Sequence, residues 1–215
     1  KPNLKPQILA NRLKTILLLF SENNTESYWL DKAEQIICEA IKLCRLYNNG
    51  YVTFLELHKL ITNPNYYNEK IQILRNLFIN SKFSKSQIYE LNACLDFFEK
   101  EFFSLDSKKK NILISEITRI TNTFISDYDV MSTFCSPKSK LTFNTFDTVL
   151  ESGKIVVLNI NISEYNMLSK IIATYLKLDF QTEIMTRLSK NISKTSAFIC
   201  DEYDKFASKT DGEFF

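Results

Sequence analysis

Only three glycines occur in the 215 residues, at Gly50, Gly153 and Gly212. Average usage would give roughly fifteen glycines in a chain of this length. A turn-dense β-sandwich or a Gly/Ser linker is therefore hard to build from this sequence. Both phosphate-binding glycine patterns are also excluded, because each needs a second glycine within about five residues to bring backbone N–H groups onto phosphate. The chain cannot form a phosphate loop by itself.

Composition otherwise describes a soluble globular protein of one or two domains, with 45% hydrophobic residues. The net charge is +2, which argues against nucleic-acid binding driven by overall charge. The longest apolar run, residues 16–20, is much shorter than the roughly twenty residues of a membrane span. Cysteines are odd in number and never form a C-x-x-C pair, which favours a reducing compartment over disulfides or zinc. They are Cys38, Cys44, Cys94, Cys135 and Cys200.

Apolar residues recur at helical spacing from about residue 8 to residue 127. A first helix is expected to end near Ser21, and five more helices follow Tyr28 and Trp29, which we interpret as an anchor. Capping boxes are expected at two of these helices, formed by Thr53 with Glu56 and by Ser84 with Gln87, and Asp106 is expected to start another. The block is predicted to be an all-helical subdomain.

The pattern changes after about residue 127. Residues 154–161 form a β-branched apolar run typical of a buried parallel strand, and residues 196–200 form a second, shorter run. Between them, apolar positions recur at helical spacing from Ser163 to Leu188. Strand, helix and strand in that order predict a β-α-β unit, so the last third is expected to be α/β.

Two adjacent carboxylates, Asp201 and Glu202, follow the second predicted strand directly. Ligands bind at the carboxyl ends of strands in open α/β sheets. A Walker B segment has this layout: its first acid holds Mg²⁺ and its second polarises the attacking water. A solvated strand end explains the same two residues, and this segment alone leaves both interpretations open.

Several short segments match one protein family in the same order along nearly the whole chain. They are NRLK at 11–14, YWLDKAE at 28–34, GKIVVLN at 153–159, KIIA at 170–173, LDFQ at 178–181 and ICDEY at 199–203. Together they resemble the coupling ATPases of type IV secretion and conjugation, the TraG/TraD type. In that family an all-α domain interrupts a RecA-like motor domain between its Walker A and Walker B motifs.

The resemblance implies a mixed α and α/β fold, in which an all-α domain is inserted in a partial RecA-like P-loop NTPase domain. Residues 1–27 would be a helix of the motor domain, residues 28–133 the substrate-docking domain, and residues 134–215 the partial nucleotide-binding domain. It assigns Mg²⁺ to Asp201 and the catalytic base to Glu202. The lack of an initiator Met and the abrupt end at Phe215 suggest a piece of a longer protein, with Walker A upstream.

The implied function is that of a ring-forming ATPase, a homo-hexamer when intact, that couples ATP hydrolysis to DNA transfer through a type IV secretion system. Its partners would be DNA, relaxosome or secreted proteins, and other secretion components. The intact parent would work at the cytoplasmic face of the bacterial membrane, with no membrane contact from this soluble chain. ATP and Mg²⁺ would bind the parent, and the isolated chain is expected to be inactive.

Two other classes of function stay open. A non-enzymatic helical adaptor would leave Asp201 and Glu202 merely exposed. A phosphate-loop motif upstream of Lys1 would favour the motor, and its absence from the whole parent would favour the adaptor. A ring translocase of chromosomal DNA is a third class, and the long helical insertion argues against it.

Three further features of the helical block have simple structural explanations. His58 has no second histidine near it and is expected to be an ordinary helix residue. The three lysines at 108–110 are expected to be a solvated first turn and not a DNA contact, because residues 31–135 hold 13 basic and 13 acidic side chains. Four phenylalanines cannot share one face of an α-helix, so core packing is expected for most and a partner surface is the alternative. They are Phe97, Phe98, Phe102 and Phe103.

Overall fold

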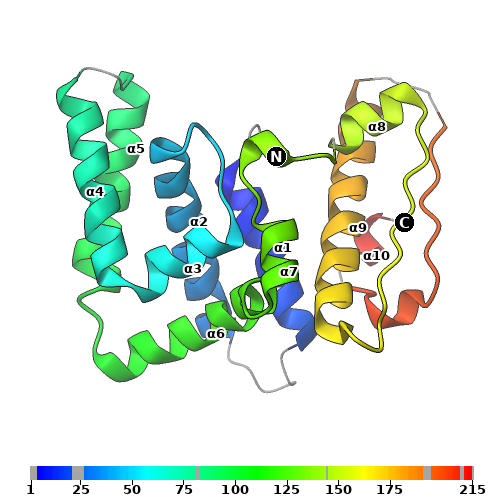
Figure 1. The fold of residues 1–215 in the computed structure, drawn as a ribbon, viewed down its shortest axis with the longest axis horizontal. Coiled ribbons are helices and arrows are strands. Elements are labelled where there is room, and N and C mark those ends of the chain that lie inside the picture. The colour runs from blue at the N-terminus through cyan, green and yellow to red at the C-terminus, as the bar shows by residue number, and fades with distance from the viewer. Residues whose placement is uncertain are drawn as a thin grey trace. The chain divides into compact units, whose positions relative to one another are not determined.

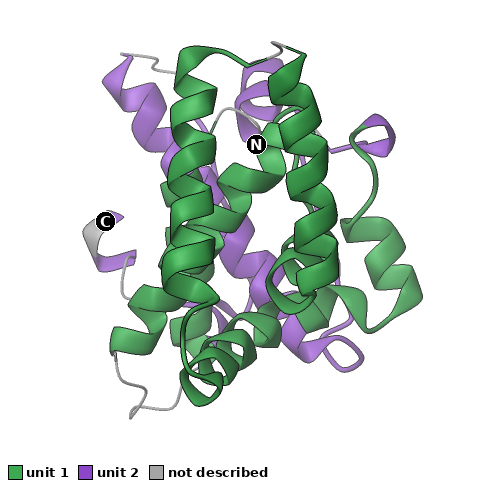
Figure 2. Cartoon of the chain, turned by 90° about the vertical axis from the view of Figure 1, so that its left-hand side faces the viewer, with its two compact units in different colours: residues 1–138 green, residues 139–215 purple. Residues whose placement is uncertain are grey.

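The computed structural model describes residues 4–20, 27–80, 83–143, 145–190, 195–208 and 211–214 (Figure 1). The chain divides into two compact units, residues 1–138 and residues 139–215 (Figure 2). Within the described ranges, no helix is long and apolar enough to cross a membrane.

Residues 1–138, here called the helical unit, contain helices throughout. Its elements are α1 (Pro6–Phe20), α2 (Ser27–Tyr47), α3 (Phe54–Thr62), α4 (Pro64–Ile79), α5 (Lys85–Asp96), the π-helix η1 (Phe97–Phe102), α6 (Ser107–Ile125) and α7 (Tyr128–Phe134). Helix α2 packs against α1, α3, α4, α5 and α6. It is apolar on several sides for this reason, and Leu30, Ala33 and Leu43 are all buried.

The helix starts expected from the sequence are confirmed. The Thr53 hydroxyl accepts a hydrogen bond from the Glu56 amide while the Glu56 carboxylate accepts one from the Thr53 amide. Ser84 and Gln87 form the same reciprocal pair at the start of α5. The Asp106 side chain caps α6 by accepting from the Lys109 amide. Each cap satisfies amides that a helix start would otherwise leave unpaired.

The four phenylalanines that an α-helix would scatter lie in and beside η1. A π-helix forms hydrogen bonds from residue i to i+5, and the Phe103 amide accordingly donates to the Phe98 carbonyl oxygen at 2.8 Å. The ring centroid of Phe98 lies 5.9 Å from that of Phe102 and 5.8 Å from that of Phe103. The wider turn buries Phe97, Phe98 and Phe102 together, and Phe103 packs against Tyr67 with ring centroids 4.9 Å apart.

Residues 139–215, here called the C-terminal unit, are organised around one long helix. The short 3₁₀ helix η2 (Lys138–Lys140) lies where the two units join in sequence, and the unit then contains α8 (Phe146–Ser152), α9 (Asn166–Ser189), the 3₁₀ turn η3 (Tyr203–Lys205) and α10 (Asp211–Phe214). Phe180 of α9 packs against Phe146 of α8, with ring centroids 5.8 Å apart, and against Phe198, with centroids 5.1 Å apart. Gly153 ends α8 in the left-handed region at φ 65°, a conformation that glycine adopts without strain.

The α/β prediction for this unit is wrong. Residues 154–161 and 195–200 are extended, but the described residues contain no strand pairing and no sheet, so the fold is all-α and no RecA-like β-α-β unit is present (Figure 1). Ile155, Val157 and Ile199 are 91%, 83% and 95% exposed, whereas buried strands were expected. A β-branched apolar run favours extended backbone, yet a strand forms only when a neighbour supplies the ladder of N–H and C=O groups.

The aromatic cluster around η1 should carry much of the stability of the helical unit. Phe98→Ala removes a side chain that is fully buried, so we expect a loss of about 3–5 kcal/mol. Phe78→Ala on α4, where the side chain is 48% exposed, is the matched control and should cost much less. The single tryptophan, Trp29, lies in this unit, so its fluorescence during urea unfolding measures the effect. Equal midpoints for the two variants would contradict the packing.

Candidate functional site

Asp201 and Glu202 lie in a tight turn between the extended residues 195–200 and η3, and both side chains are exposed. Glu202 has φ 51° and ψ 42°, in the left-handed region, which costs a non-glycine residue about 1–2 kcal/mol. Its amide donates to Asp201 Oδ1 at 2.9 Å, and its carboxylate pairs with Lys205 Nζ at 2.6 Å. The turn therefore holds two carboxylates side by side in solvent.

The chemistry available to this pair is limited but definite. Mg²⁺ keeps several waters and is often held by one or two carboxylates together with substrate phosphates, so Asp201 could contribute one ligand. Among the described residues, no group of three His, Cys, Asp or Glu side chains is placed to hold a metal. Glu202 would have to leave Lys205 before acting as a base. The structure leaves the metal and base roles of Asp201 and Glu202 as predictions.

A buried ion pair holds the chain that follows this turn, and no pattern in the sequence indicates it. Lys177 Nζ on α9 lies 2.7 Å from Asp211 Oδ2 and donates to the Phe206 carbonyl oxygen at 2.8 Å and to Ser208 Oγ at 3.1 Å. Both charged side chains are buried. Gln181 Nε2 also donates to Asp211, at 3.1 Å.

Burial and hydrogen bonding act in opposite directions on the pKa of Asp211 in this ion-pair cluster. Burial alone raises the pKa of Asp211, but hydrogen bonds from Lys177 and from the Ser208 amide outweigh it and hold the pKa well below its usual value. The carboxylate is therefore ionised down to strongly acidic pH. Lys177 Nζ also lies 5.3 Å from the ring centroid of Tyr203, the first residue of η3. The cluster thus connects α9 to both ends of the segment after Glu202.

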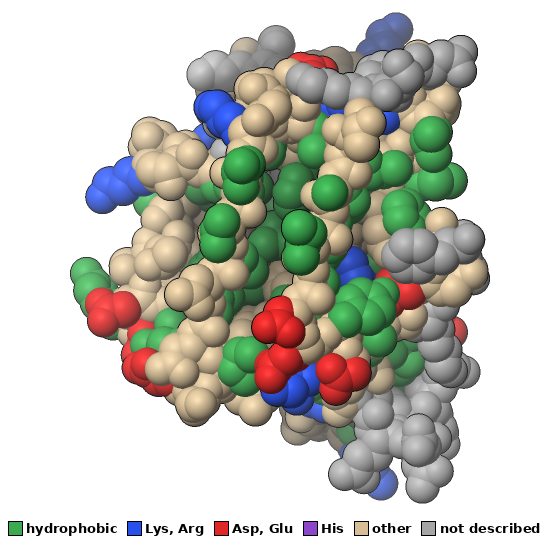
Figure 3. All heavy atoms as spheres, turned by 90° about the vertical axis from the view of Figure 1, so that its right-hand side faces the viewer, with side chains coloured by type: hydrophobic (Ala, Val, Ile, Leu, Met, Phe, Trp, Pro, Cys, Tyr) green, Lys and Arg blue, Asp and Glu red, His purple; other side chains and the backbone are tan. Residues whose placement is uncertain are grey.

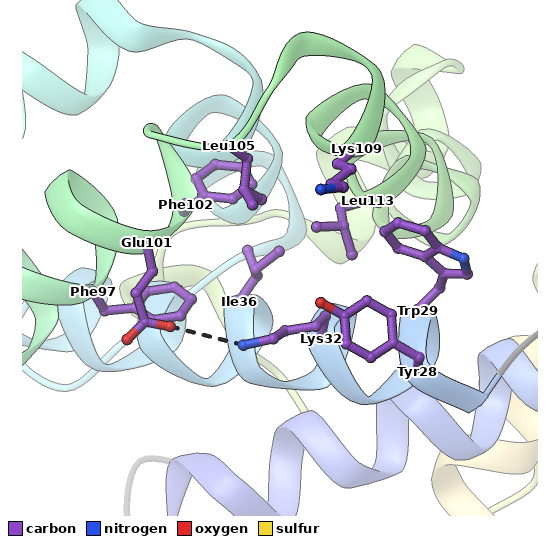
Figure 4. A pocket seen from close by; sticks show the side chains of 10 residues that line it. All are labelled: Tyr28, Trp29, Lys32, Ile36, Phe97, Glu101, Phe102, Leu105, Lys109 and Leu113. Atoms are coloured by element: carbon purple, nitrogen blue, oxygen red, sulfur yellow. Dashed lines mark ion pairs between the residues drawn. The ribbon is translucent and has the colours of Figure 1, made fainter.

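The helical unit contains a pocket of about 270 Å³ between the start of α2, η1 and the start of α6 (Figure 4). Ile36, Phe102 and Leu113 form its buried apolar floor. The ring of Tyr28 is more than half exposed and packs edge-on against Trp29, with centroids 5.2 Å apart. The remaining lining residues are Lys32, Phe97, Glu101, Leu105 and Lys109.

Charged side chains surround this apolar floor. Lys32 Nζ lies 3.7 Å from Glu101 Oε2 (Figure 4). Lys109 Nζ lies 3.3 Å from Asp106 Oδ2, just outside the pocket. Both pairs are solvent-accessible, so they hold the side chains only weakly. The π-helix brings Phe97, Glu101 and Phe102 to the same side, which is why three residues of one short segment reach the pocket. Such π-turns are frequent at functional sites.

The other residues singled out from the sequence have mixed outcomes. His58 Nδ1 lies 2.9 Å from Thr121 Oγ1, and burial lowers its pKa, as fits an ordinary helix residue. In the turn that starts α6, Lys108 is exposed as expected for a solvated turn, whereas Lys109 also lines the pocket. The anchor interpretation of Tyr28 and Trp29 accounts for their place beside α6 but misses the pocket they border. Two features of the sequence could have indicated the pocket: the adjacent aromatic residues at the start of α2 and the phenylalanine-rich segment that forms η1.

Comparisons with known proteins find no match for this chain: no family model fits it, and no curated protein or solved structure is significantly similar.

Breaking the buried ion pair should destabilise the C-terminal unit. Lys177→Met leaves Asp211 as a buried charge without its partner, so we expect a loss of about 3–5 kcal/mol. Adding Asp211→Asn should restore part of it, because the uncompensated charge is removed. Lys170→Met, a half-buried lysine on the same helix, is the control. Amide hydrogen exchange in α9 is the measurement, since the only tryptophan lies in the other unit. Unchanged exchange in Lys177→Met would rule out the stabilising role.

Proposed function

We propose that the helical unit docks a partner protein, and that its pocket receives a large apolar side chain from an acidic segment of that partner. The observation that carries this proposal is the pocket itself, with its buried apolar floor, aromatic edge and charged rim. Aromatic side chains of this kind are enriched where one protein binds another.

The size of the pocket favours a side-chain anchor over a nucleotide or a large metabolite. Its volume of about 270 Å³ lies just below the range for small-molecule sites, roughly 300–1,000 Å³. The sequence also has no glycine pattern that could close around phosphate. A single bulky side chain, presented by a helix or an extended peptide, fits such a volume.

The charges indicate which segment would bind. Two lysines lie on the solvent-accessible rim of the pocket, and each faces one carboxylate: Lys32 faces Glu101 and Lys109 faces Asp106. An acidic residue next to the anchor would pair with Lys32 or Lys109. It would compete there with the carboxylate that each lysine already faces. The helical block as a whole is neutral, with 13 basic and 13 acidic side chains in residues 31–135, which suits a protein partner better than DNA.

A docking module is consistent with both leading interpretations of the sequence. In a coupling ATPase the partner would be a relaxosome or secreted protein delivered for transfer. In a non-enzymatic adaptor it would be any protein carrying the same acidic, apolar motif. The docking proposal therefore does not depend on nucleotide chemistry.

Charge reversal at the rim should weaken docking without unfolding the chain. Peptides selected from a random displayed library on the 215-residue chain should share an aromatic or leucine residue beside Asp or Glu. The double variant Lys32→Glu, Lys109→Glu should bind them about tenfold more weakly, since each change replaces an attraction worth up to about 1 kcal/mol by a repulsion. Lys108→Glu, an exposed neighbour outside the pocket, should bind as the wild type does. Equal binding by both variants would refute the proposed site.

A second candidate function is the metal and water-activating half of an ATP site, completed by a phosphate loop elsewhere in a longer protein. It is favoured by one specific observation: Asp201 and Glu202 are adjacent, exposed and held in a left-handed turn directly after an extended apolar segment. Unusual backbone conformations of this kind cluster at active sites. In this proposal Asp201 binds Mg²⁺, Glu202 orients the attacking water, and DNA transfer is the work coupled to hydrolysis.

The variant Glu202→Gln tests this second function. In a longer protein that contains a phosphate loop, Glu202→Gln should keep ATP binding and lower turnover about 10²-fold or more, because the base is lost and the shape is kept. Asp204→Asn, an exposed carboxylate on η3, should leave turnover nearly unchanged. Steady-state phosphate release and nucleotide binding are the two measurements. Full turnover in Glu202→Gln would exclude the assignment.

A further inference from the structure

The C-terminal unit exposes two extended apolar segments side by side on one face. Residues 154–161 and 195–200 form two ridges, and hydrophobic side chains lie along both and in the hollow between them (Figure 3). Acidic side chains gather at one end of the hollow (Figure 3). In the sequence, Asp201, Glu202 and Asp204 directly follow the second segment, and all three are exposed. A soluble protein rarely leaves a contiguous apolar surface of this kind uncovered.

The exposure pattern shows how the first segment lies. Ile155 and Val157 are 91% and 83% exposed, whereas Val156 and Leu158 are 45% and 48% exposed. This alternation is the period of two that an extended chain has when one of its faces is directed inward. In the second segment Phe198 packs on Phe180 of α9 while Ile199 is 95% exposed. Even the inward side chains are thus only half covered.

Among the described residues, the backbone of both segments also lacks hydrogen-bond partners. Within the part of the chain that the structure describes, no backbone hydrogen bond involves the amides or carbonyl groups of residues 155–160 or 195–200. Unpaired edges of β-branched sequence are templates for another strand. We propose that the hollow between these segments accepts one extended strand from a partner polypeptide, by strand addition.

Chemistry and shape specify the partner strand. Residues 155–161 and 195–200 contain no charged side chain, so a strand lying between them must be uncharged and rich in apolar residues. At the acidic end of the hollow, a Lys or Arg flanking the strand would face Asp201, Glu202 and Asp204. A second copy of this chain is a poor occupant, because its own segments already have one face against α9 and cannot enter the hollow without it.

A defined peptide tests the proposal. The probe contains about six alternating valine and threonine residues, a typical strand length, followed by two lysines. Amide hydrogen exchange of the 215-residue chain should slow at residues 155–160 and 195–200 when the probe binds. The same peptide with alternate amides N-methylated should give little protection, because it cannot form a ladder. A probe ending in two glutamates should bind more weakly.

Variants at one exposed position separate backbone pairing from side-chain contact. Val157→Pro removes an amide donor and should weaken probe binding about tenfold, whereas Val157→Thr keeps the donor and the β-branched shape and should bind normally. Equal binding by both variants, or equal protection by the N-methylated peptide, would overturn strand addition. Protection that appears without probe and grows with protein concentration would instead show that a second copy is the occupant and would overturn the assigned partner.

Discussion

Every backbone amide and carbonyl group needs a hydrogen-bond partner. The two units of this chain differ in how they meet that need. A helix satisfies most of its own groups and leaves only its ends to be capped, as Thr53, Ser84 and Asp106 do in the helical unit. An extended segment has no internal partner and depends on whatever lies beside it. Most described residues of the helical unit lie in helices, whereas residues 155–160 and 195–200 have backbone groups with no such partner among the described residues.

The same distinction explains which features the sequence could predict. Helix positions and caps follow from residues three or four apart, so periodicity placed most helices and the caps located the starts of α3, α5 and α6, whereas α7 (Tyr128–Phe134) was not predicted. The extended character of residues 154–161 was also visible, because β-branched residues favour it whether or not a sheet forms. The sheet was not predictable from the run itself, since pairing depends on a neighbouring strand. Ile155 and Val157, expected to be buried, are therefore among the most exposed side chains.

The candidate sites show a similar limit. Lys177 and Asp211 are 34 positions apart, and nothing in either local sequence indicates that they meet in a buried pair. The pocket is made by α2, η1 and α6, and it depends on a π-turn that brings Phe97, Glu101 and Phe102 to one side. A strict α-helical reading of that segment predicts a scattered arrangement. Residue types could be read from the sequence, but their convergence required the fold.

Asp201 and Glu202 lie between two of these features, the extended apolar segment that precedes them and the chain held by Lys177 that follows. The Lys177 cluster holds the chain that follows their turn, through Phe206 and Ser208, and the turn itself directly follows the second extended apolar segment. A strand bound in the hollow would bring its last residue beside the two carboxylates and exclude water from them. Partial desolvation raises the energy of like charges held together, so a basic group at that point would be strongly favoured. The carboxylate pair and the open apolar face are thus best understood as one surface, whose chemistry depends on what covers it.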